Sequence, residues 1–200
     1  MGTPPRVIRL SSLALNSKEG ALECDTHTDT SVLGRGTLII QDFQRPVMVE
    51  GYDPSMGSHV YPTVSGVLGY IHPFSLQRYH LIVHQGISVP HLDHHLCCPM
   101  QSRMNDVIIN DVPKFLLKNP SPDDHAFVVP DPDYPDDPDK TLTLPLLLKG
   151  VTSYLPTETV TMEEYESGEY PRIELTSEHQ VWEPNSTRFQ EQEEAHMSTW

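Results

Sequence analysis

Short apolar and β-branched runs, separated by polar turns, dominate the first half of the chain. The runs Ala21 to Cys24 and Val47 to Val49 have the length and composition of strands. A turn signal, Tyr-Asp-Pro-Ser-Met-Gly at residues 52–57, precedes a return run from His59 to Val64. This pattern predicts a β-hairpin from Val47 to Val64. No segment here repeats with the helical period, so we expect a mainly β fold.

The pattern predicts further short elements before residue 118. Val67 to Ile71 and Tyr79 to His84 have the character of two more strands. Pro99 suits the first position of a helix, which predicts a short helix over Met100 to Asn105. Val107 to Ile109 is typical of a last short strand.

The composition then changes. Residues 119–200 carry clusters of Pro and Asp and are acidic to the end. Such a segment has little apolar surface to bury, and its like charges repel one another. We therefore expect an N-terminal arm over 1–20, a folded domain over 21–118, and an acidic, Pro-rich, poorly ordered C-terminal region over 119–200. Within that region, the apolar stretch 141–148 is a candidate docked strand.

Charge and composition exclude several function classes. The 200 residues include 13 Lys and Arg against 28 Asp and Glu, a formal net charge of -15. Binding of phosphate backbones needs clustered basic residues, so we expect no nucleic-acid partner. No apolar run approaches a membrane span, and the N-terminus lacks a signal core, so we expect no membrane partner. Three cysteines, two of them adjacent, do not make a disulfide framework, which indicates a reduced, cytoplasmic protein.

The stretch from Leu22 to Gly34 carries the clearest chemical signal. A strand-like run ends at Asp25, small hydroxyl residues follow, and an apolar pair closes at Gly34. A carboxylate at the tip of a turn after a strand is placed for acid–base chemistry. By residue type alone, the stretch could equally be an ordinary polar turn.

The order Asp-Thr-His-Thr-Asp-Thr-Ser, from Asp25 to Ser31, resembles the active-site turn of retropepsins. These are the aspartic proteases of retroviruses and retrotransposons, whose motif reads Asp-Thr/Ser-Gly-Ala-Asp-Thr-Ser. His27 replaces the motif Gly and Thr28 the motif Ala, a variant similar to that of copia-type retrotransposon polyproteins. The resemblance extends more loosely to about Phe115.

The resemblance implies a single retropepsin-like β-barrel lobe with one short helix. It also implies an aspartic endopeptidase that cleaves a polyprotein without a cofactor, with Asp25 and Thr26 as catalytic residues. Two carboxylates must share one proton in this mechanism, and the chain holds one such motif, so the resemblance implies a homodimer. The hairpin would be the flap over a polypeptide substrate. Candidate substrate-binding residues are His27, Asp29, Tyr52, Asp53, Met56 and Gly57.

The element before the predicted helix departs from the family. Leu96 to Pro99 takes the place of an apolar-apolar-Gly element, with Pro99 where the family has Gly. Met100 stands where the family has Arg, which leaves Arg103 as a candidate ion-pair partner of Asp29.

Two alternatives stay open. A lobe with His27 at the glycine position could keep the fold without catalysis and serve as a dimerisation or binding module. A metal site is the second alternative, because Zn²⁺ accepts both imidazole and thiolate ligands. Its candidate ligands are His91, His94, His95, Cys97 and Cys98, or the set Asp25, His27 and Asp29.

Overall fold

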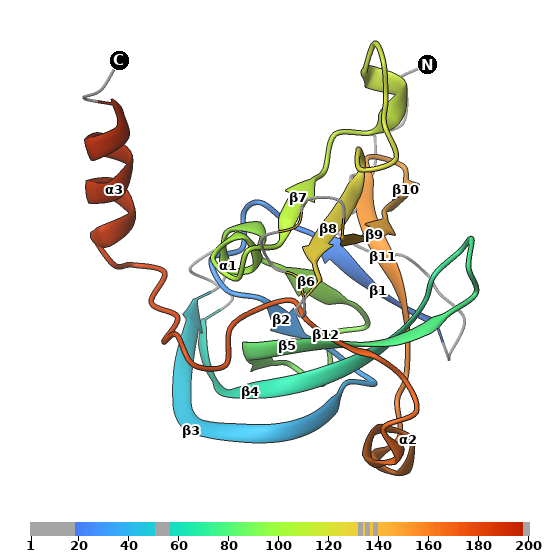
Figure 1. The fold of residues 1–200 in the computed structure, drawn as a ribbon. Helices are drawn as coiled ribbons and strands as arrows, with labels where there is room; N and C mark the ends of the chain where they lie inside the picture. Colours follow the sequence, from blue (N-terminus) through green and yellow to red (C-terminus); the bar gives the residue numbers. More distant parts are fainter. Residues whose placement is uncertain (1–18, 51–56, 132–133, 135–136, 138–139, 198–200) are drawn as a thin grey trace, which may run out of the picture.

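A computed structural model describes residues 19–50, 57–131, 134, 137 and 140–197 (Figure 1). The described part of the chain is mainly β, as the sequence predicts. It forms a nine-stranded sheet and a three-stranded sheet. The larger sheet has the order β10 (Leu147–Lys149), β11 (Thr152–Glu158), β1 (Glu19–Cys24), β6 (His95–Cys97), β2 (Val32–Leu33), β5 (Arg78–Ser88), β4 (Ser58–Ile71), β3 (Leu38–Glu50), with β12 (Arg172–Glu174) beside β5.

The smaller sheet and the helices complete the described fold. The smaller sheet has the order β7 (Ile108–Asn110), β8 (Ala126–Pro130), β9 (Thr141–Pro145). The helices are α1 (Pro99–Arg103), α2 (Met162–Ser167), α3 (Arg188–Met197) and a 3-10 turn, Lys114–Leu116. Pro99 occupies the first turn of α1, as its fixed backbone angle favours.

Strand β6 lies between β1 and β2, the two strands that the Asp25 turn connects. It runs parallel to β1, with Cys24 opposite Cys97, and antiparallel to β2, with Val32 opposite Leu96. The turn from Asp25 to Ser31 must therefore pass over the carboxyl end of β6. This arrangement supports the turn from beneath.

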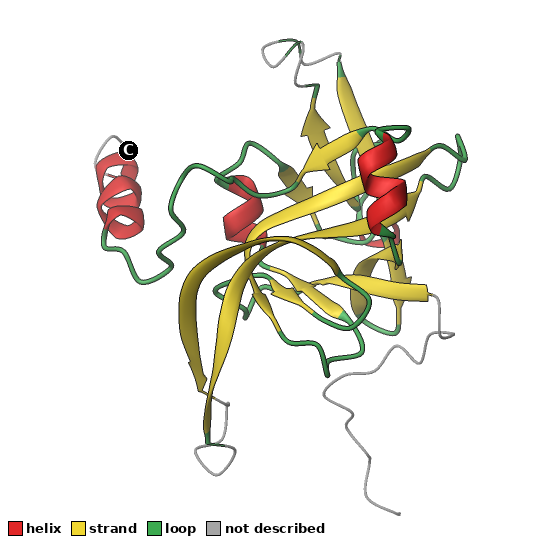
Figure 2. Ribbon diagram, turned by 90° about the horizontal axis from the view of Figure 1, so that it is seen from below, coloured by secondary structure: helices red, strands yellow, loops and turns green. Residues whose placement is uncertain are grey.

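Strands β3 and β4 form the predicted hairpin, which is longer than the sequence indicated. Strand β4 is continuous where the sequence pattern suggested two strands. Its pairing with β5 begins at Thr63, so the outer part pairs with β3 alone, as in the Pro46–Pro62 pair. Figure 2 shows this two-stranded part reaching away from the body. Irregular register between Asp42 and Pro46 bends the ribbon.

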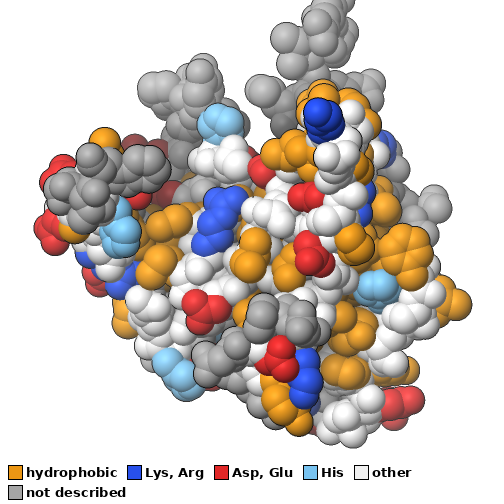
Figure 3. All heavy atoms as spheres, turned by 45° about the horizontal axis from the view of Figure 1, so that its top comes forward, with side chains coloured by type: hydrophobic (Ala, Val, Ile, Leu, Met, Phe, Trp, Pro, Cys, Tyr) orange, Lys and Arg blue, Asp and Glu red, His pale blue; other side chains and the backbone are white. Residues whose placement is uncertain are grey.

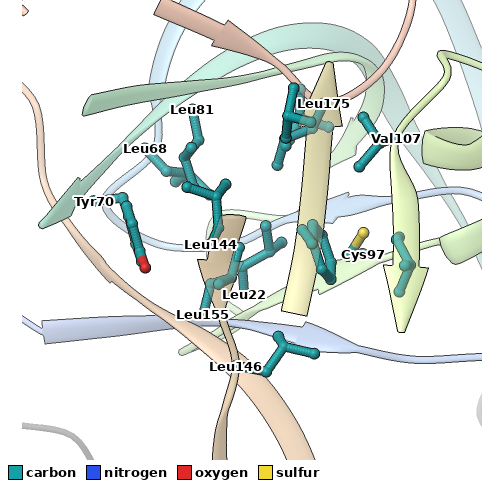
Figure 4. Close-up of a cluster of buried hydrophobic side chains, with 14 of the residues drawn as sticks. Leu22, Leu68, Tyr70, Leu81, Cys97, Val107, Leu144, Leu146, Leu155 and Leu175 are labelled. Atoms are coloured by element: carbon teal, nitrogen blue, oxygen red, sulfur yellow. The ribbon is translucent and has the colours of Figure 1, made fainter. Parts of the chain in front are cut away.

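The expectation of a poorly ordered tail from residue 119 is not met. Phe127, Leu144, Leu155 and Leu175 are buried in the same core as Leu22 (Figure 4). Strand β11 buries every second residue, as in a strand with one face in the core, whereas β8 buries four residues in a row. The low average hydrophobicity of the region therefore does not reveal these short buried stretches. The folded unit therefore continues past residue 118, and β9 and most of β10 fall within the stretch expected to dock.

Helix α3 differs from the rest of the C-terminal region. It has no buried residue and lies away from the body (Figure 1).

Among the described residues, no helix is both long and apolar enough to cross a membrane.

Candidate active site

Asp25 stands at the carboxyl end of β1 and begins the turn over β6. Its backbone N–H donates to the Cys97 carbonyl at 3.1 Å. Its Oδ1 accepts from the His27 backbone N–H at 2.9 Å, and its side chain is 35% exposed. The turn thus holds one carboxylate oxygen and leaves the group open to a ligand.

His27 and Thr26 lie beside Asp25 on the exposed side of the turn. The His27 ring is almost fully exposed, and its Nδ1 lies 3.8 Å from Asp25 Oδ1. The imidazole therefore points outward and does not disturb the close packing beneath the turn. This explains how the turn accommodates His where the resembling family has Gly.

Helix α1 supports the turn through Gln101, which sequence reasoning did not single out. Gln101 is 3% exposed, and its Oε1 accepts from the Ser31 backbone N–H at 2.9 Å. Its Nε2 lies 3.3 Å from the His84 and Gln85 carbonyls on β5. A buried amide that is hydrogen-bonded at both its oxygen and its nitrogen holds α1, β5 and the turn together.

His95 supports the other end of the turn, at Gly34. Its Nδ1 accepts from the Gly34 backbone N–H at 3.0 Å. Burial lowers the pKa of His95 to about 4, so the ring is neutral near pH 7. A Cβ at residue 34 would lie 2.1 Å from the His94 carbonyl oxygen, so the close approach requires glycine.

A cleft of about 850 Å³ opens between the Asp25 turn, the β3–β4 hairpin and β5. His27 and Asp29 line it from the turn. Much of the remaining wall is apolar and comes from several elements. These apolar residues are Val32, Val47, Met48, Val49, Ile87, Val89, Leu92 and Leu96.

The other predicted substrate-binding residues either fall outside the part of the chain that the structure describes or do not line the cleft. Tyr52, Asp53 and Met56 lie outside the described residues. Gly57 is described, with a φ of 70° at the start of β4, but it does not line the cleft. The cleft therefore brings together two of the predicted positions, His27 and Asp29.

The predicted ion pair between Arg103 and Asp29 does not form. Arg103 instead donates to the Ile109 carbonyl at 3.1 Å, because the last turn of α1 faces β7. The Asp29 backbone carbonyl accepts a hydrogen bond from the Trp182 indole Nε1 at 2.9 Å. Sequence reasoning placed Trp182 in a disordered tail, although an aromatic residue in an acidic segment was a signal against disorder.

The His and Cys residues of the metal hypothesis are not assembled for coordination. His95 bonds to Gly34, and burial raises the pKa of the Cys97 thiol, which opposes formation of a thiolate. In the part of the chain that the structure describes, no group of three His, Cys, Asp or Glu residues is arranged to hold a metal ion. Nothing here favours the metal alternative.

The charged surface is consistent with the dispersed basic residues of the sequence. On the face shown in Figure 3, the Lys and Arg side chains of the described residues lie apart from one another. That face offers no concentrated basic patch of the kind that binds a phosphate backbone.

Comparison with known proteins places the chain in no family. No family model, curated protein or solved structure matches it.

Proposed function

We propose that the chain is a retropepsin-like aspartic endopeptidase derived from a retrotransposon polyprotein. One observation carries the proposal: Asp25 is held, partly exposed, at the start of a turn whose later residues, from His27 to Thr30, line a cleft beside a long hairpin. Asp25 and Thr26 adjoin this cleft in sequence but are not among the residues that line it. A general acid or base needs this combination of a fixed carboxylate and an adjoining binding surface.

The proposed mechanism uses the Asp25 side chains of two copies. Two carboxylates placed close together cannot both ionise, so they share one proton. The ionised one takes a proton from water, whose oxygen adds to the substrate carbonyl carbon, and the protonated one donates to the carbonyl oxygen. Collapse of this intermediate breaks the C–N bond, with a proton passing to the leaving amine. Thr26 is exposed beside Asp25 and would hydrogen-bond across the axis between the two copies.

His27 distinguishes this site from the active-site turn of the retropepsins, which has Gly at the same position. Its imidazole Nδ1 lies 3.8 Å from Asp25 Oδ1, so the paired carboxylates would work beside two histidines. We propose that His27 tunes the reaction and also contacts substrate from the edge of the cleft.

The cleft favours an extended peptide as the substrate. Val47, Met48 and Val49 of β3 line it. Strand β3 is the last strand in the order of the large sheet, and such a strand edge is the surface that peptide strands recognise. Apolar side chains beside the cleaved bond fit this wall. The hairpin would close over the bound peptide and exclude water.

The decisive experiment compares the native chain with Asp25→Asn on a peptide mixture from acidic to neutral pH. We expect Asp25→Asn to lower kcat/KM by on the order of a thousandfold or more, because Asn cannot exchange protons. Asp93→Asn is the matched control, since Asp93 is 74% exposed and pairs with Arg35 on the surface. Cleavage that survives in Asp25→Asn would overturn the proposal. EDTA should have no effect.

A dilution series tests the two-copy requirement. Because each chain supplies one Asp25, activity per chain should fall when the protein is diluted below its dimer dissociation constant. Sedimentation velocity at the same concentrations should show the dimer dissociating. Constant activity per chain from a sedimenting monomer would contradict the homodimer.

The same experiments judge the non-catalytic alternative. The His27 ring beside Asp25 is the feature that favours it, because its Nδ1 lies 3.8 Å from the carboxylate, at the position where the retropepsin motif has Gly. A folded dimer that binds peptides but cleaves none at any pH would identify a binding module.

A further inference from the structure

A buried glutamine on β5 holds part of the C-terminal region against the cleft. Gln85 is 2% exposed, and its Nε2 donates to the carbonyls of Ser177 and Gln180 at 2.8 Å and 2.7 Å. Its Oε1 accepts from the Trp182 backbone N–H at 2.9 Å and from Arg45 at 3.0 Å. Both ends of the amide are therefore used, and three of these four bonds fasten residues 177–182.

The chain before this segment is anchored to the same strand. Strand β12 runs parallel to β5, and the Thr176 hydroxyl donates to the His84 carbonyl at 2.8 Å and accepts from the His84 N–H at 2.7 Å. Thr176 is 1% exposed. The segment thus leaves β5 with a fixed direction and place.

From Gln85 the segment enters the cleft. Trp182, Pro184 and Asn185 are among the residues that line it. The Trp182 indole N–H donates to the Asp29 carbonyl at 2.9 Å and lies 3.2 Å from the Thr30 hydroxyl. The indole therefore uses polar groups that an incoming peptide would otherwise meet.

We propose that residues 177–185 are an intramolecular occupant of the Asp29 end of the cleft, and that a peptide using this end must first displace Trp182. The ligand class for this end follows from the occupant: an extended peptide with a large aromatic side chain that carries an N–H donor. Two further statements rest on the proposed function: the displacing peptide is a substrate, and segment 177–185 inhibits its cleavage.

The hydrogen bonds that anchor the segment to β5 differ in burial from those that hold the Trp182 side chain in the cleft. The Gln85 and Thr176 bonds are buried, whereas the Trp182 side chain is half-buried and makes neutral hydrogen bonds. The indole has one N–H, and loss of one neutral hydrogen bond corresponds to roughly a three- to tenfold change in occupancy. A peptide can therefore displace the indole while the anchor stays in place.

A fluorescence measurement tests the occupant without any catalysis. The chain has two tryptophans, so Trp200→Phe leaves Trp182 as the sole tryptophan, which is excited selectively at a wavelength that tyrosine does not absorb. Its emission should be blue-shifted and less quenched by acrylamide than that of the free peptide Val-Trp-Glu-Pro-Asn. Emission and quenching equal to those of the free peptide would overturn the proposal.

A binding measurement tests whether removal of the Trp182 side chain opens the Asp29 end of the cleft to a peptide. In an Asp25→Asn background, the fluorescein-labelled peptide Val-Trp-Glu-Pro-Asn should bind the Trp182→Ala chain roughly three- to tenfold more tightly than the chain that keeps Trp182. Val181→Ala is the matched control, because Val181 neighbours Trp182, is 48% exposed and does not line the cleft. Trp182→Phe keeps the ring without its donor and should give an intermediate affinity. Equal affinity for all chains would overturn the proposal.

Kinetics separate this inference from the proposed function. With catalysis intact, Trp182→Ala should lower KM for cleaved peptides by a similar factor and leave kcat unchanged, whereas Val181→Ala should change neither. A raised KM would mean that Trp182 is a wall that helps substrate bind, which contradicts the proposal. If no chain cleaves but the binding pattern holds, the occupant stands and the endopeptidase fails.

Discussion

At the scale of single residues, buried histidines are the groups that link the stability of the core to pH. Burial lowers the pKa values of His84, His95 and His125. Each also holds structure: His84 bonds to Ser65, His95 to Gly34 and His125 to Ser153. Protonation would place a charge where the fold provides no solvent, so these side chains link stability to pH.

We predict that the free energy of unfolding falls as the pH falls from 6.5 to 4. In this range the unfolded chain binds protons that folded His95 does not, since the pKa of His95 is lowered from 6.5 to about 4. His95 alone accounts for about 3 kcal/mol of the loss, at about 1.4 kcal/mol per pH unit. Urea unfolding at pH values between 7.5 and 4.5 measures the effect.

His95→Asn is the informative variant. Its Oδ1 can still accept from the Gly34 N–H but does not titrate. We expect lower stability at pH 7.5 from lost packing, with a shallower fall toward pH 4.5. An equal pH slope in both chains would show that His95 is not the group responsible.

At the scale of elements, the docking of α2 on β5 shows how an acidic segment becomes structured. Thr161 accepts from the Glu164 backbone N–H at 3.1 Å as the N-cap, and Gly168 ends the helix with a φ of 67°. Glu164 then bonds to Arg78 and to the buried His80 at 2.6 Å and 3.1 Å. These hydrogen bonds lower the pKa of Glu164, against the opposing effect of burial.

We predict that Thr161→Ala destabilises the protein by about 1 kcal/mol, because the Glu164 N–H loses its capping partner. Thr161→Ser keeps the hydroxyl and should retain most of the stability. Chemical unfolding of the three chains at pH 7.5 measures the difference. Equal losses for Ala and Ser would point to packing of the Thr161 methyl group as the cause.

At the scale of the whole molecule, the two halves of the chain build one core. Strand β11 pairs with β1, with Leu155 opposite Leu22, and both side chains are fully buried. The strand that presents Asp25 is therefore held on one side by β6 and on the other by the C-terminal region. The Asp25 turn therefore depends on residues far beyond the segment that resembles the retropepsins.

We predict that a chain ending at Lys118 does not fold. It lacks Phe127, Leu144, Leu155 and Leu175, and burial of each such side chain contributes about 1.5–3 kcal/mol, comparable in total to the stability of a typical domain. A chain ending at Thr187 loses α3, which buries no residue, and the last three residues. The contact that it loses with Trp182 is that of the Phe189 ring, so it should unfold within about 0.5 kcal/mol of the given chain. Circular dichroism and urea titration distinguish these outcomes, and a cooperative transition in the shorter chain would contradict the prediction.

Local chemistry explains what could be predicted from the sequence alone. The strand into Asp25, the turn, the hairpin and the helix at Pro99 each depend on residues that are neighbours in the chain. Their signals are the apolar run, the polar turn and the fixed backbone angle of proline. The sequence also determined that Asp25 and His27 lie together, because they are two residues apart.

Tertiary structure alone decided what surrounds Asp25 and His27. Leu155 and Leu175 lie in segments whose composition favours solvent, and they are buried only because β1 and β5 offer apolar partners. Trp182 reaches Asp29 because Gln85 holds the intervening segment. The free energy of these contacts arises between residues distant in the chain, so no local pattern records it, and the cleft wall became visible only in the fold.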